Sequence, residues 1–368
     1  MSPRFIPGAE LCRVFFAEAV KPVIDDAFPQ LRYAAALLGS GSEVLGFDTA
    51  MSTDHDWGPR VDLFLEPDDF DSMRLTLDGV LRDRLPPTFR GFSTSFTDPD
   101  PNDHGTQLPE HRDGAPIRHK IRIVTPASFF QEYLGFDIAR EAAPADWLTF
   151  PEQKLRTITC GPIYHDAISL GAVRERFTYY PRDIWLYLLA AAWTRIGQEE
   201  HLMGRAGSVG DELGSALIGA RLVRDVMRLC FLMEKAYAPY PKWLGTAFRR
   251  LDCADALSPD LAGALSSRTW RDRETHLAKA YEIIAKSHAQ LGITDPLPTS
   301  VRPFFGRPFQ VIALHGFADA IIARIDDPDV RALAKRSRIG GIDQMSDNTD
   351  LLSNSKWREQ LRALYETE

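Results

Sequence analysis

Stretches with the character of β-strands are confined to the first 125 of the 368 residues, and this distribution limits the folds that the chain can adopt. Residues 32–38 (RYAAALL), 60–65 (RVDLFL) and 119–125 (HKIRIVT) have strand-like composition or alternation. After about residue 150 strand patterns largely disappear and helical ones replace them. The sequence therefore predicts an α+β chain: a small mixed sheet within residues 1–148, followed by an α-helical domain in residues 149–368.

Helices are predicted from apolar periodicity and from the residues that begin helices. In the N-terminal part they cover residues 9–21, which Pro22 should end or kink, and residues 68–85. In the C-terminal part they cover 181–202, 211–238, 272–290 and 309–325. The stretch EAAPADWLTFPEQ contains two prolines, which favour a domain boundary near residues 145–155. A separate helical segment is expected from about residue 292.

Bulk composition argues against several classes of protein. An apolar fraction of 44% and a charged fraction of 26% are typical of a soluble globular chain. The formal net charge of −8 disfavours nucleic-acid binding over the whole surface but leaves a local basic groove open. The four cysteines are scattered and form no CxxC pair, which predicts neither a zinc site nor a disulfide framework and fits reduced thiols in the cytoplasm. No membrane partner is expected, since no apolar run is long enough to span a bilayer.

The stretch LLGSGSEVLGFDTAMSTDHDWGPRVDLFL, residues 37–65, holds the most specific chemistry. It places a Ser/Gly turn after an apolar run, and then two aspartates, Asp54 and Asp56, before a strand. If this segment is extended, both carboxylates point to one side and His55 points to the other. Two carboxylates that close repel each other unless a cation lies between them, and Mg²⁺ (or Mn²⁺) shared with phosphates is the common solution. Turns of small residues also let backbone N–H groups approach a phosphate.

The combination of Leu38-Gly39-Ser40 with Asp54-His55-Asp56 resembles the signature of the nucleotidyltransferase superfamily, the DNA polymerase beta-like group. Gly41-Ser42 is an alternative register for the first half of the signature. The resemblance implies that Gly39 and Ser40 or Ser42 contact the nucleotide phosphates. It also implies that Asp54 and Asp56 are the catalytic residues and hold Mg²⁺.

A second set of candidate residues lies in the helical half. Arg221, Arg224 and Arg228 recur at i, i+3 and i+7 and therefore share one helix face, which taken alone is most simply a solvated basic face paired with nearby aspartates. The YPKW turn that follows resembles the C-terminal helical domain of antibiotic and small-molecule nucleotidyltransferases. There a lysine in this turn reaches the triphosphate of ATP, which implies that role for Lys242, with Arg224 or Arg228 assisting. Longer stretches, including PEQKL, are similar to an uncharacterised family of nucleotidyltransferase-like domain proteins of unknown function.

The chain departs from the superfamily pattern at one position. Active members usually carry a third carboxylate on a neighbouring strand, but the expected strand, RHKIRIVT, holds Arg118, Lys120 and Arg122 at its outward positions and no acid. Two explanations are open. Either the protein has lost transfer chemistry and keeps nucleotide binding, or another acid takes the role of the third carboxylate. The candidates for that role are Asp62 on the preceding strand and, in the helical half, Glu199, Glu200 and Asp211.

Together these features predict a nucleotidyltransferase that transfers an NMP from an NTP, ATP first, to a hydroxyl of a small-molecule or RNA acceptor with Mg²⁺. The acidic net charge favours a small molecule, while the basic segment 111–120 (HRDGAPIRHK) leaves a tRNA acceptor open. One alternative is a catalytically impaired nucleotide-binding or regulatory protein of the same fold. Another is a toxin-like protein acting on tRNA, suggested by Arg195 and His201 in RIGQEEH.

Overall fold

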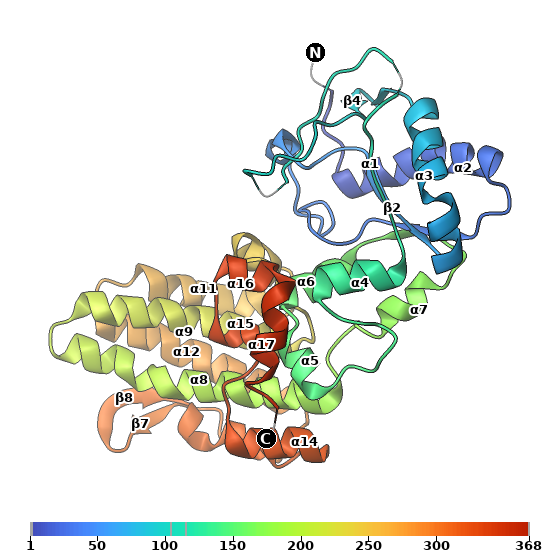
Figure 1. Cartoon of the computed structure of the whole chain (residues 1–368). Helices are drawn as coiled ribbons and strands as arrows, with labels where there is room; N and C mark the ends of the chain where they lie inside the picture. The colour runs from blue at the N-terminus through green and yellow to red at the C-terminus, as the bar shows by residue number, and fades with distance from the viewer. Residues whose placement is uncertain (1–2, 104, 115, 367–368) are drawn as a thin grey trace. The chain divides into compact units, whose positions relative to one another are not determined.

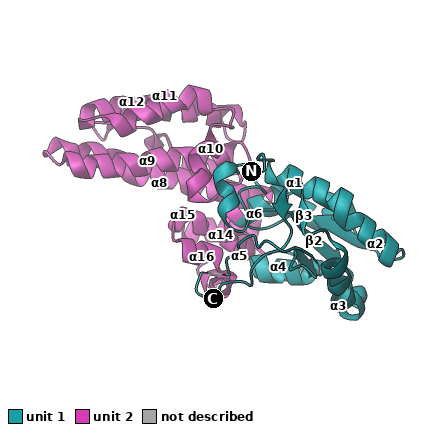
Figure 2. Cartoon of the chain, turned by 90° about the horizontal axis from the view of Figure 1, so that it is seen from above, with its two compact units in different colours: residues 1–141, 154–178 teal, residues 142–153, 179–368 magenta. Residues whose placement is uncertain are grey.

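The computed structural model describes residues 3–103, 105–114 and 116–366, and the chain forms two compact units. Unit 1 consists of residues 1–141 and 154–178, and unit 2 of residues 142–153 and 179–368 (Figure 2). The boundary expected between residues 148 and 149 falls inside the short segment that belongs to unit 2. The chain thus passes between the units three times, after residues 141, 153 and 178.

Unit 1 is built on a four-stranded mixed sheet in the order β5-β2-β1-β6. Figure 1 labels strand β2 of this sheet. Its strands are β1 (Tyr33–Ala36), β2 (Arg60–Leu65), β5 (Lys120–Val124) and β6 (Ile163–Asp166). Strand β1 runs antiparallel to β2 and to β6, whereas β2 and β5 are parallel. The predicted small mixed sheet is confirmed, and three of its strands lie where the sequence places them. Strand β6 was not predicted, because its four residues are only partly buried and lack an alternating apolar pattern.

The two faces of the sheet are covered differently. Odd-numbered residues of β1, β2 and β5 join an apolar core with α1 (Gly8–Phe15), α2 (Lys21–Ala27) and α3 (Pro67–Arg84), which connects β2 to β5. Even-numbered residues point to the opposite face. There Phe64 packs against Phe129 of α4 (Pro126–Leu134), with ring centroids 5.4 Å apart. The even positions 62, 120 and 122 are charged, so polar groups collect on the face beside α4.

Pro22 does not end the first helix. A π-helical turn, η1 (Phe16–Val20), joins α1 to α2, and the Lys21 N–H donates to the carbonyl oxygen of Phe16, five residues back. A proline inside a helix lacks one N–H and crowds the carbonyl four residues earlier. The wider π turn directly before Pro22 accommodates both defects, so the helical segment continues to Ala27.

The remaining elements of unit 1 are short. The segment after α3 is largely irregular, as expected. Its described residues form the small hairpin β3 (Thr88–Phe89) and β4 (Phe92–Ser93) and two isolated β-bridges, Phe96–Pro109 and Asp100–Thr106. The 3₁₀ helix η2 (Ala50–Asp54) precedes β2. Helix α6 (Glu152–Cys160) leads into β6, and α7 (Leu170–Glu175) follows it.

Unit 2 is predominantly helical. Helices α8 (Arg182–Ser208) and α9 (Glu212–Met233) pack against each other as a helical hairpin, and α11 (Ala254–Ser266) and α12 (Trp270–Gln290) pack on α9. The shorter helices are α5 (Pro144–Thr149), η3 (Pro241–Trp243), α10 (Leu244–Phe248), η4 (Ala313–His315), α13 (Phe317–Ile322), α14 (Pro328–Arg336), α15 (Ile342–Met345), α16 (Thr349–Ser353), η5 (Ser355–Trp357) and α17 (Arg358–Arg362). None of the helices in the described residues combines the length and the apolar composition needed to cross a membrane.

The C-terminal segment closes over the first helix of unit 2. Asp146 of α5 is fully buried, and its carboxylate pairs with the guanidinium groups of Arg358 and Arg362 in α17. It also accepts a hydrogen bond of 2.9 Å from the N–H of Ala143, the N-cap residue of α5. A buried carboxylate requires such partners, so α5 depends on α17 for its place.

The helix predicted over residues 309–325 is only partly correct. Residues Arg302–Phe304 (β7) and Arg307–Val311 (β8) form a hairpin, and regular helix begins at Phe317 in α13. Gly306 and Gly316 have φ angles of +77° and +81°, and Pro308 cannot donate a helical hydrogen bond. These three residues divide the segment into a hairpin, a turn and a short helix.

Glu200 of α8 fixes the end of this hairpin. Its carboxylate accepts hydrogen bonds from the backbone N–H groups of Ile312 (2.7 Å) and Ala313 (3.2 Å). Burial nevertheless raises the pKa of Glu200 from 4.5 to about 7. Between these two pH values the folded chain keeps a proton that the unfolded chain has released. The contribution of Glu200 to stability is therefore largest below pH 4.5 and is lost as the pH rises through about 7.

We expect Glu200→Gln to remove this pH dependence, because glutamine keeps one acceptor oxygen and cannot ionise. Urea unfolding at pH 5 and pH 8 should show that the free energy of unfolding of the variant rises relative to that of the wild type by about 1–3 kcal/mol over this range. Glu359→Gln, at an exposed position of α17, is the matched control and should show no such gain. A difference between Glu200→Gln and wild type that is independent of pH would contradict the prediction.

Candidate functional site

The sheet of unit 1 brings the Ser/Gly turn and the charged strand residues to one edge. Ala36 at the end of β1 lies opposite Asp62 in β2, and Asp62 lies opposite Arg122 in β5. The turn follows β1 directly, so it lies beside both charged residues. A Cβ atom placed on Gly39 would be 3.7 Å from Nη2 of Arg122 and 3.7 Å from the ring of Tyr133.

Residues 39–42 form a turn with free backbone donors. Gly39 and Gly41 have φ angles of +86° and +143°, which residues with a Cβ rarely adopt. The backbone N–H groups of residues 39–42 donate no hydrogen bond to any other residue that the structure describes. Residues 43–46 continue as turns and not as a helix. The capacity of this segment to bind an anion therefore comes from the free N–H groups themselves.

Arg60 fastens the turn to the sheet. Its Nη2 donates to the carbonyl oxygen of Ser40 at 2.8 Å, and its Nε donates to Oε1 of Glu43 at 2.9 Å. Glu43 is buried, and a Cβ atom on Gly41 would come within 2.6 Å of both side chains. The side chains of Arg60 and Glu43 thus hold the turn in shape and place one guanidinium under it.

Asp62 is the central acid of this edge and is fully engaged. It is 3% exposed, and its Oδ1 accepts from Nε of Arg122 at 2.9 Å while its Oδ2 accepts from the N–H of Leu38 at 3.0 Å. The guanidinium carbon of Arg122 also lies 4.8 Å from the centroid of the Phe129 ring. Asp62 can serve as the missing third acid only if Arg122 releases it. Arg122 itself occupies the strand on which the third acid was expected.

The segment Asp54-His55-Asp56 is not extended as predicted. Asp54 ends the 3₁₀ helix η2, His55 has extended geometry, and Asp56 has a φ angle of +51°. Nδ1 of His55 lies 3.0 Å from Oδ2 of Asp54, so His55 contacts this acid and does not point away from it. This contact lowers the pKa of Asp54. The expected alternation fails because it applies to a strand, and β2 begins only at Arg60.

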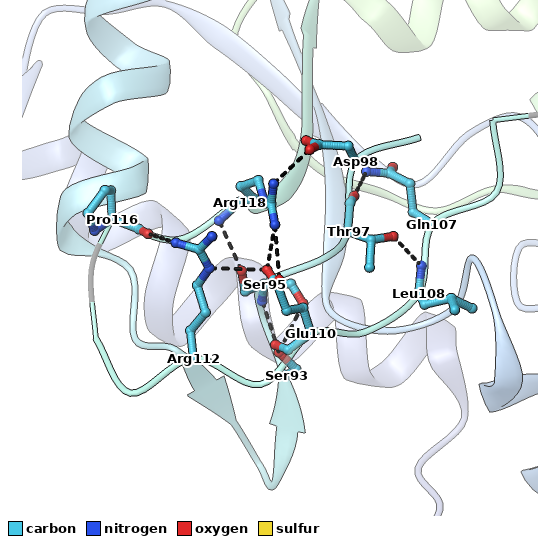
Figure 3. A network of polar contacts seen from close by, with 10 residues as sticks. All are labelled: Ser93, Ser95, Thr97, Asp98, Gln107, Leu108, Glu110, Arg112, Pro116 and Arg118. Carbon is cyan, nitrogen blue, oxygen red and sulfur yellow. Dashed lines mark hydrogen bonds and ion pairs between the residues drawn. The ribbon is translucent and has the colours of Figure 1, made fainter. Parts of the chain in front are cut away.

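Asp56 is held by β5 and by the long loop that precedes β5. Its carboxylate pairs with Nζ of Lys120 and accepts from the N–H of Gln107 at 3.3 Å, and its own N–H donates to the Gln107 carbonyl oxygen at 3.0 Å. Figure 3 shows how Gln107 is placed: its side chain donates to the carbonyl oxygen of Thr97 at 2.9 Å, and the next residue, Leu108, donates to the Thr97 hydroxyl at 3.0 Å. Asp56 is therefore fixed from two sides.

Two arginines of the basic segment 111–120 belong to the same loop network (Figure 3). Arg118 pairs with Asp98 and with Glu110, each at 2.8 Å. Arg112 pairs with Glu110 at 3.1 Å and donates to the carbonyl oxygen of Pro116 at 3.2 Å. These guanidinium groups thus have carboxylate partners within unit 1, and their contacts stabilise the loop that positions Gln107.

The donors that this segment offers to a metal ion are two exposed carboxylates, those of Asp54 and Asp56. No three His, Cys, Asp or Glu side chains are grouped to hold a metal among the residues that the structure describes. The side chains of Asp54 and Asp56 are 63% and 47% exposed, so both are accessible to a ligand. Mg²⁺ is commonly bound by one or two carboxylates together with substrate phosphates, which matches this donor set.

Helices α4 and α6 add polar groups that sequence analysis missed. The hydroxyl of Tyr133 lies 2.7 Å from that of Thr157, and Nζ of Lys154 donates to the carbonyl oxygen of Tyr133 at 2.6 Å. Burial lowers the pKa of Lys154 to about 8. These residues belong to no motif. The one signal in the sequence is the stretch PEQKL, which includes Lys154 and carries a family resemblance that implies no role for the lysine.

A cavity of about 500 Å³ opens next to the acidic segment in unit 1. Its aromatic walls come from Phe5, Trp57 and Phe92, and the ring of Trp57 lies 5.9 Å from Phe5 and 5.1 Å from Phe92. Thr53, the residue before Asp54, also lines it. A cavity of this size with apolar walls and a few polar groups is suited to a small organic molecule.

The candidate residues of the helical half lie in unit 2. Lys242 is exposed in the turn η3, with its Nζ 5.0 Å from the ring centroid of Trp243. Arg224 and Arg228 lie on α9. The expected solvated face is wrong for Arg228, which is buried. The spacing of the arginines identifies a shared face but not the residues that cover it.

The other acids and the Arg/His pair of unit 2 have structural contacts. Glu199 pairs with Arg221, Glu200 binds the backbone after β8, and Asp211 caps α9 by accepting from the N–H of Gly214 at 2.7 Å. Arg195 donates to Asp225 at 2.9 Å, whereas the ring of His201 lies 4.0 Å from that of Phe304. Arg195 and His201 thus have separate partners.

The chain shows limited similarity to known proteins. A family model of a domain of unknown function, DUF4037, matches residues 147–244 and so does not include the turn or the acidic segment of unit 1. No curated protein matches the chain. Among solved structures, the chain is similar to a nucleotidyltransferase-like protein from Exiguobacterium sibiricum 255-15, with 11% identity, coverage of 77% of this chain and 78% of that one, and a TM-score of 0.32. A TM-score this low does not establish a shared fold.

The contacts separate a structural aspartate from an exposed one. Asp62→Ala would leave the Leu38 N–H and the Arg122 guanidinium without their acceptor, and we expect urea unfolding to show a loss of about 2–4 kcal/mol. Asp54→Ala removes an exposed side chain, and we expect no measurable shift of the urea unfolding midpoint. Equal effects of the two substitutions would contradict the structural role of Asp62.

Proposed function

We propose that unit 1 binds the phosphate groups of a nucleoside triphosphate, with ATP as the first candidate, and that the chain is a nucleotide-binding protein of the nucleotidyltransferase type. The observation that carries this proposal is the run of free backbone N–H groups in residues 39–42, next to Arg60 and Arg122. Consecutive backbone N–H groups form a concave site for anions, and guanidinium groups add charge-assisted hydrogen bonds. The exposed hydroxyl of Ser40 is a further donor.

Asp54 and Asp56 would hold a Mg²⁺ or Mn²⁺ ion that enters with the nucleotide. Such an ion offsets the negative charge of the phosphates, and two carboxylates with phosphate oxygens are a common ligand set. Asp56 would then exchange Lys120 for the metal. Lys120 would become free to contact a phosphate oxygen, since Lys120 and the Ser/Gly turn lie at the same edge of the sheet.

The organic part of the ligand is proposed to bind in the cavity lined by Phe5, Trp57 and Phe92. Stacking on aromatic rings favours a flat heterocycle or a small aromatic molecule. An RNA ligand is less favoured, because Arg112 and Arg118 of the basic segment are engaged by carboxylates of the same unit.

Binding without turnover is the function that the geometry supports best. Strand β5 carries Arg122 where a transferase needs an acid, and Arg122 engages Asp62, the only acid within strand β2. Transfer of an NMP to a hydroxyl acceptor is the second candidate, and the accessibility of Asp54 and Asp56 favours it. We do not propose an RNase-like activity, because Arg195 and His201 have separate structural contacts.

We expect the thermal unfolding midpoint of the protein to rise with increasing Mg·ATP concentration. Ser40→Asp places a negative charge at the turn and should weaken the affinity at least tenfold, because it repels the phosphates. Thr76→Asp on the exposed surface of α3 makes the same change in charge in the same unit and should leave the affinity unchanged. Equal affinities of the two variants would contradict the phosphate site.

Incubation with α-labelled NTPs, Mg²⁺ or Mn²⁺, and extracts of small molecules and tRNA distinguishes the two candidate functions. We expect no transfer of label, together with weaker metal-dependent ATP binding in the double variant Asp54→Asn/Asp56→Asn. Label transfer that disappears in this variant would establish the second candidate. ATP binding that is equally strong in the variant would contradict the role of both acids.

A further inference from the structure

Arg228 of α9 is a buried guanidinium with unused hydrogen-bond donors. Its residue is 9% exposed, and its Nε and Nη1 atoms donate no hydrogen bond in the described structure. Two carboxylates face it at ion-pair distance: Oε1 of Glu152 lies 3.9 Å from Nη1, and Oδ1 of Asp347 lies 3.6 Å from Nη2. Buried polar groups are nearly always hydrogen-bonded, so unpartnered donors of this kind indicate a missing acceptor.

Arg224, one helical turn earlier on α9, repeats this arrangement. Its Nη1 pairs with Oδ2 of Asp347, its Nη2 lies 3.5 Å from Asp225, and its Nε has no hydrogen-bond partner in the described residues. Asp225 is already engaged by Arg195 at 2.9 Å. Burial lowers the pKa of Arg224, and the positive charges of Arg228 and Arg195 lower it further. The two arginines of α9 are therefore close neighbours with one acid, Asp347, shared between them.

Asp347 bridges the two arginines with one carboxylate oxygen each. It lies in the turn between α15 and α16, and its side chain is 48% exposed. The residues on either side are anchored independently: the N–H of Ser346 donates to the carbonyl oxygen of Ile342 at 2.9 Å, and the side chain of Asn348 caps α16. The Asp347 carboxylate can therefore turn toward solvent while α15 and α16 keep their hydrogen bonds.

The charges define the ligand that would replace Asp347. Without its carboxylate, Arg224 would keep only Asp225, which Arg195 already engages, as an ion-pair partner. Arg228 would keep Glu152, whose Oε2 already accepts from the N–H of Ala238 at 2.7 Å, and the nearby buried Asp343. Two adjacent guanidinium groups with unused N–H donors suit a group with several oxygens and two negative charges. Phosphate has this character, and planar guanidinium groups bind its oxygens in pairs. A monocarboxylate offers only half of that charge.

We propose that Arg224 and Arg228 form a phosphate-binding site within unit 2, and that Asp347 occupies this site as an internal competitor when no ligand is bound. The site would take an inorganic phosphate or the phosphate group of a larger molecule. Its residues all lie in unit 2, so the proposal does not depend on nucleotide binding by unit 1.

Calorimetric titration with inorganic phosphate tests this proposal in the full chain carrying Ser40→Asp, which disables the proposed site of unit 1. Asp347→Ala should bind phosphate at least fivefold more tightly than the Ser40→Asp parent. Asp350→Ala, which removes an exposed acid from α16, should change the affinity less than twofold. Acetate should show no gain with either variant. Phosphate bound by a surviving site in unit 1 would be equal in both variants, so the difference between them reports on unit 2 alone.

Adding Arg224→Gln to the Asp347→Ala chain should abolish the gain. This position is preferred to the buried Arg228 because its side chain is partly exposed, and a circular dichroism melt checks that the variant folds. Equal phosphate affinity of Asp347→Ala and Asp350→Ala would overturn the proposal. So would a gain that persists in the Arg224→Gln chain, because the phosphate would then bind elsewhere. Pyrophosphate and a phosphate monoester, titrated in parallel, distinguish a free anion from the phosphate group of a larger ligand.

Discussion

The ion pair between Asp62 and Arg122 holds together the parts of unit 1 that form its polar edge. Asp62 in β2 accepts from the backbone of Leu38, which fixes the start of the Ser/Gly turn, and from Arg122 in β5, which packs on Phe129 of α4. A buried carboxylate is stable only with such partners, so one side chain ties β1, β2, β5 and α4 to a common geometry. The start of the turn that carries the free N–H groups follows from that geometry.

The same pair decides the electrostatic character of the edge. An acid at position 122 would put a second carboxylate beside Asp62, and the two would require a cation or a proton between them. An arginine there neutralises Asp62 without a cation or a proton, and it leaves a guanidinium directed toward the turn. One residue on β5 thus changes the charge at this position from a pair of carboxylates to a neutral ion pair. In unit 2, Asp347 and the arginines of α9 also pair one acid with neighbouring cations.

Sequence patterns were sufficient where structure depends on local composition. Strands β1, β2 and β5 and the long helices α8, α9 and α12 were predictable because apolar periodicity and helix-start residues specify them. Strand β6 was not, because its pairing with β1 comes from distant sequence. The alternation expected for Asp54 and Asp56 failed because the segment is a 3₁₀ turn. The spacing of Arg224 and Arg228 gave their common face, but the burial of Arg228 depends on Glu152 and Asp347, which lie 76 and 119 residues away.

The pairing of Asp146 with Arg358 and Arg362 has a consequence for synthesis on the ribosome. The two arginines follow the aspartate by 212 and 216 residues. At about 5–20 residues per second, the carboxylate waits roughly 10–40 s for its partners to be translated. Until then the Asp146 carboxylate lacks these two guanidinium partners, so the buried pairing between α5 and α17 is a late event. The contact that covers α5 is therefore completed only when the last turn of α17 has been made.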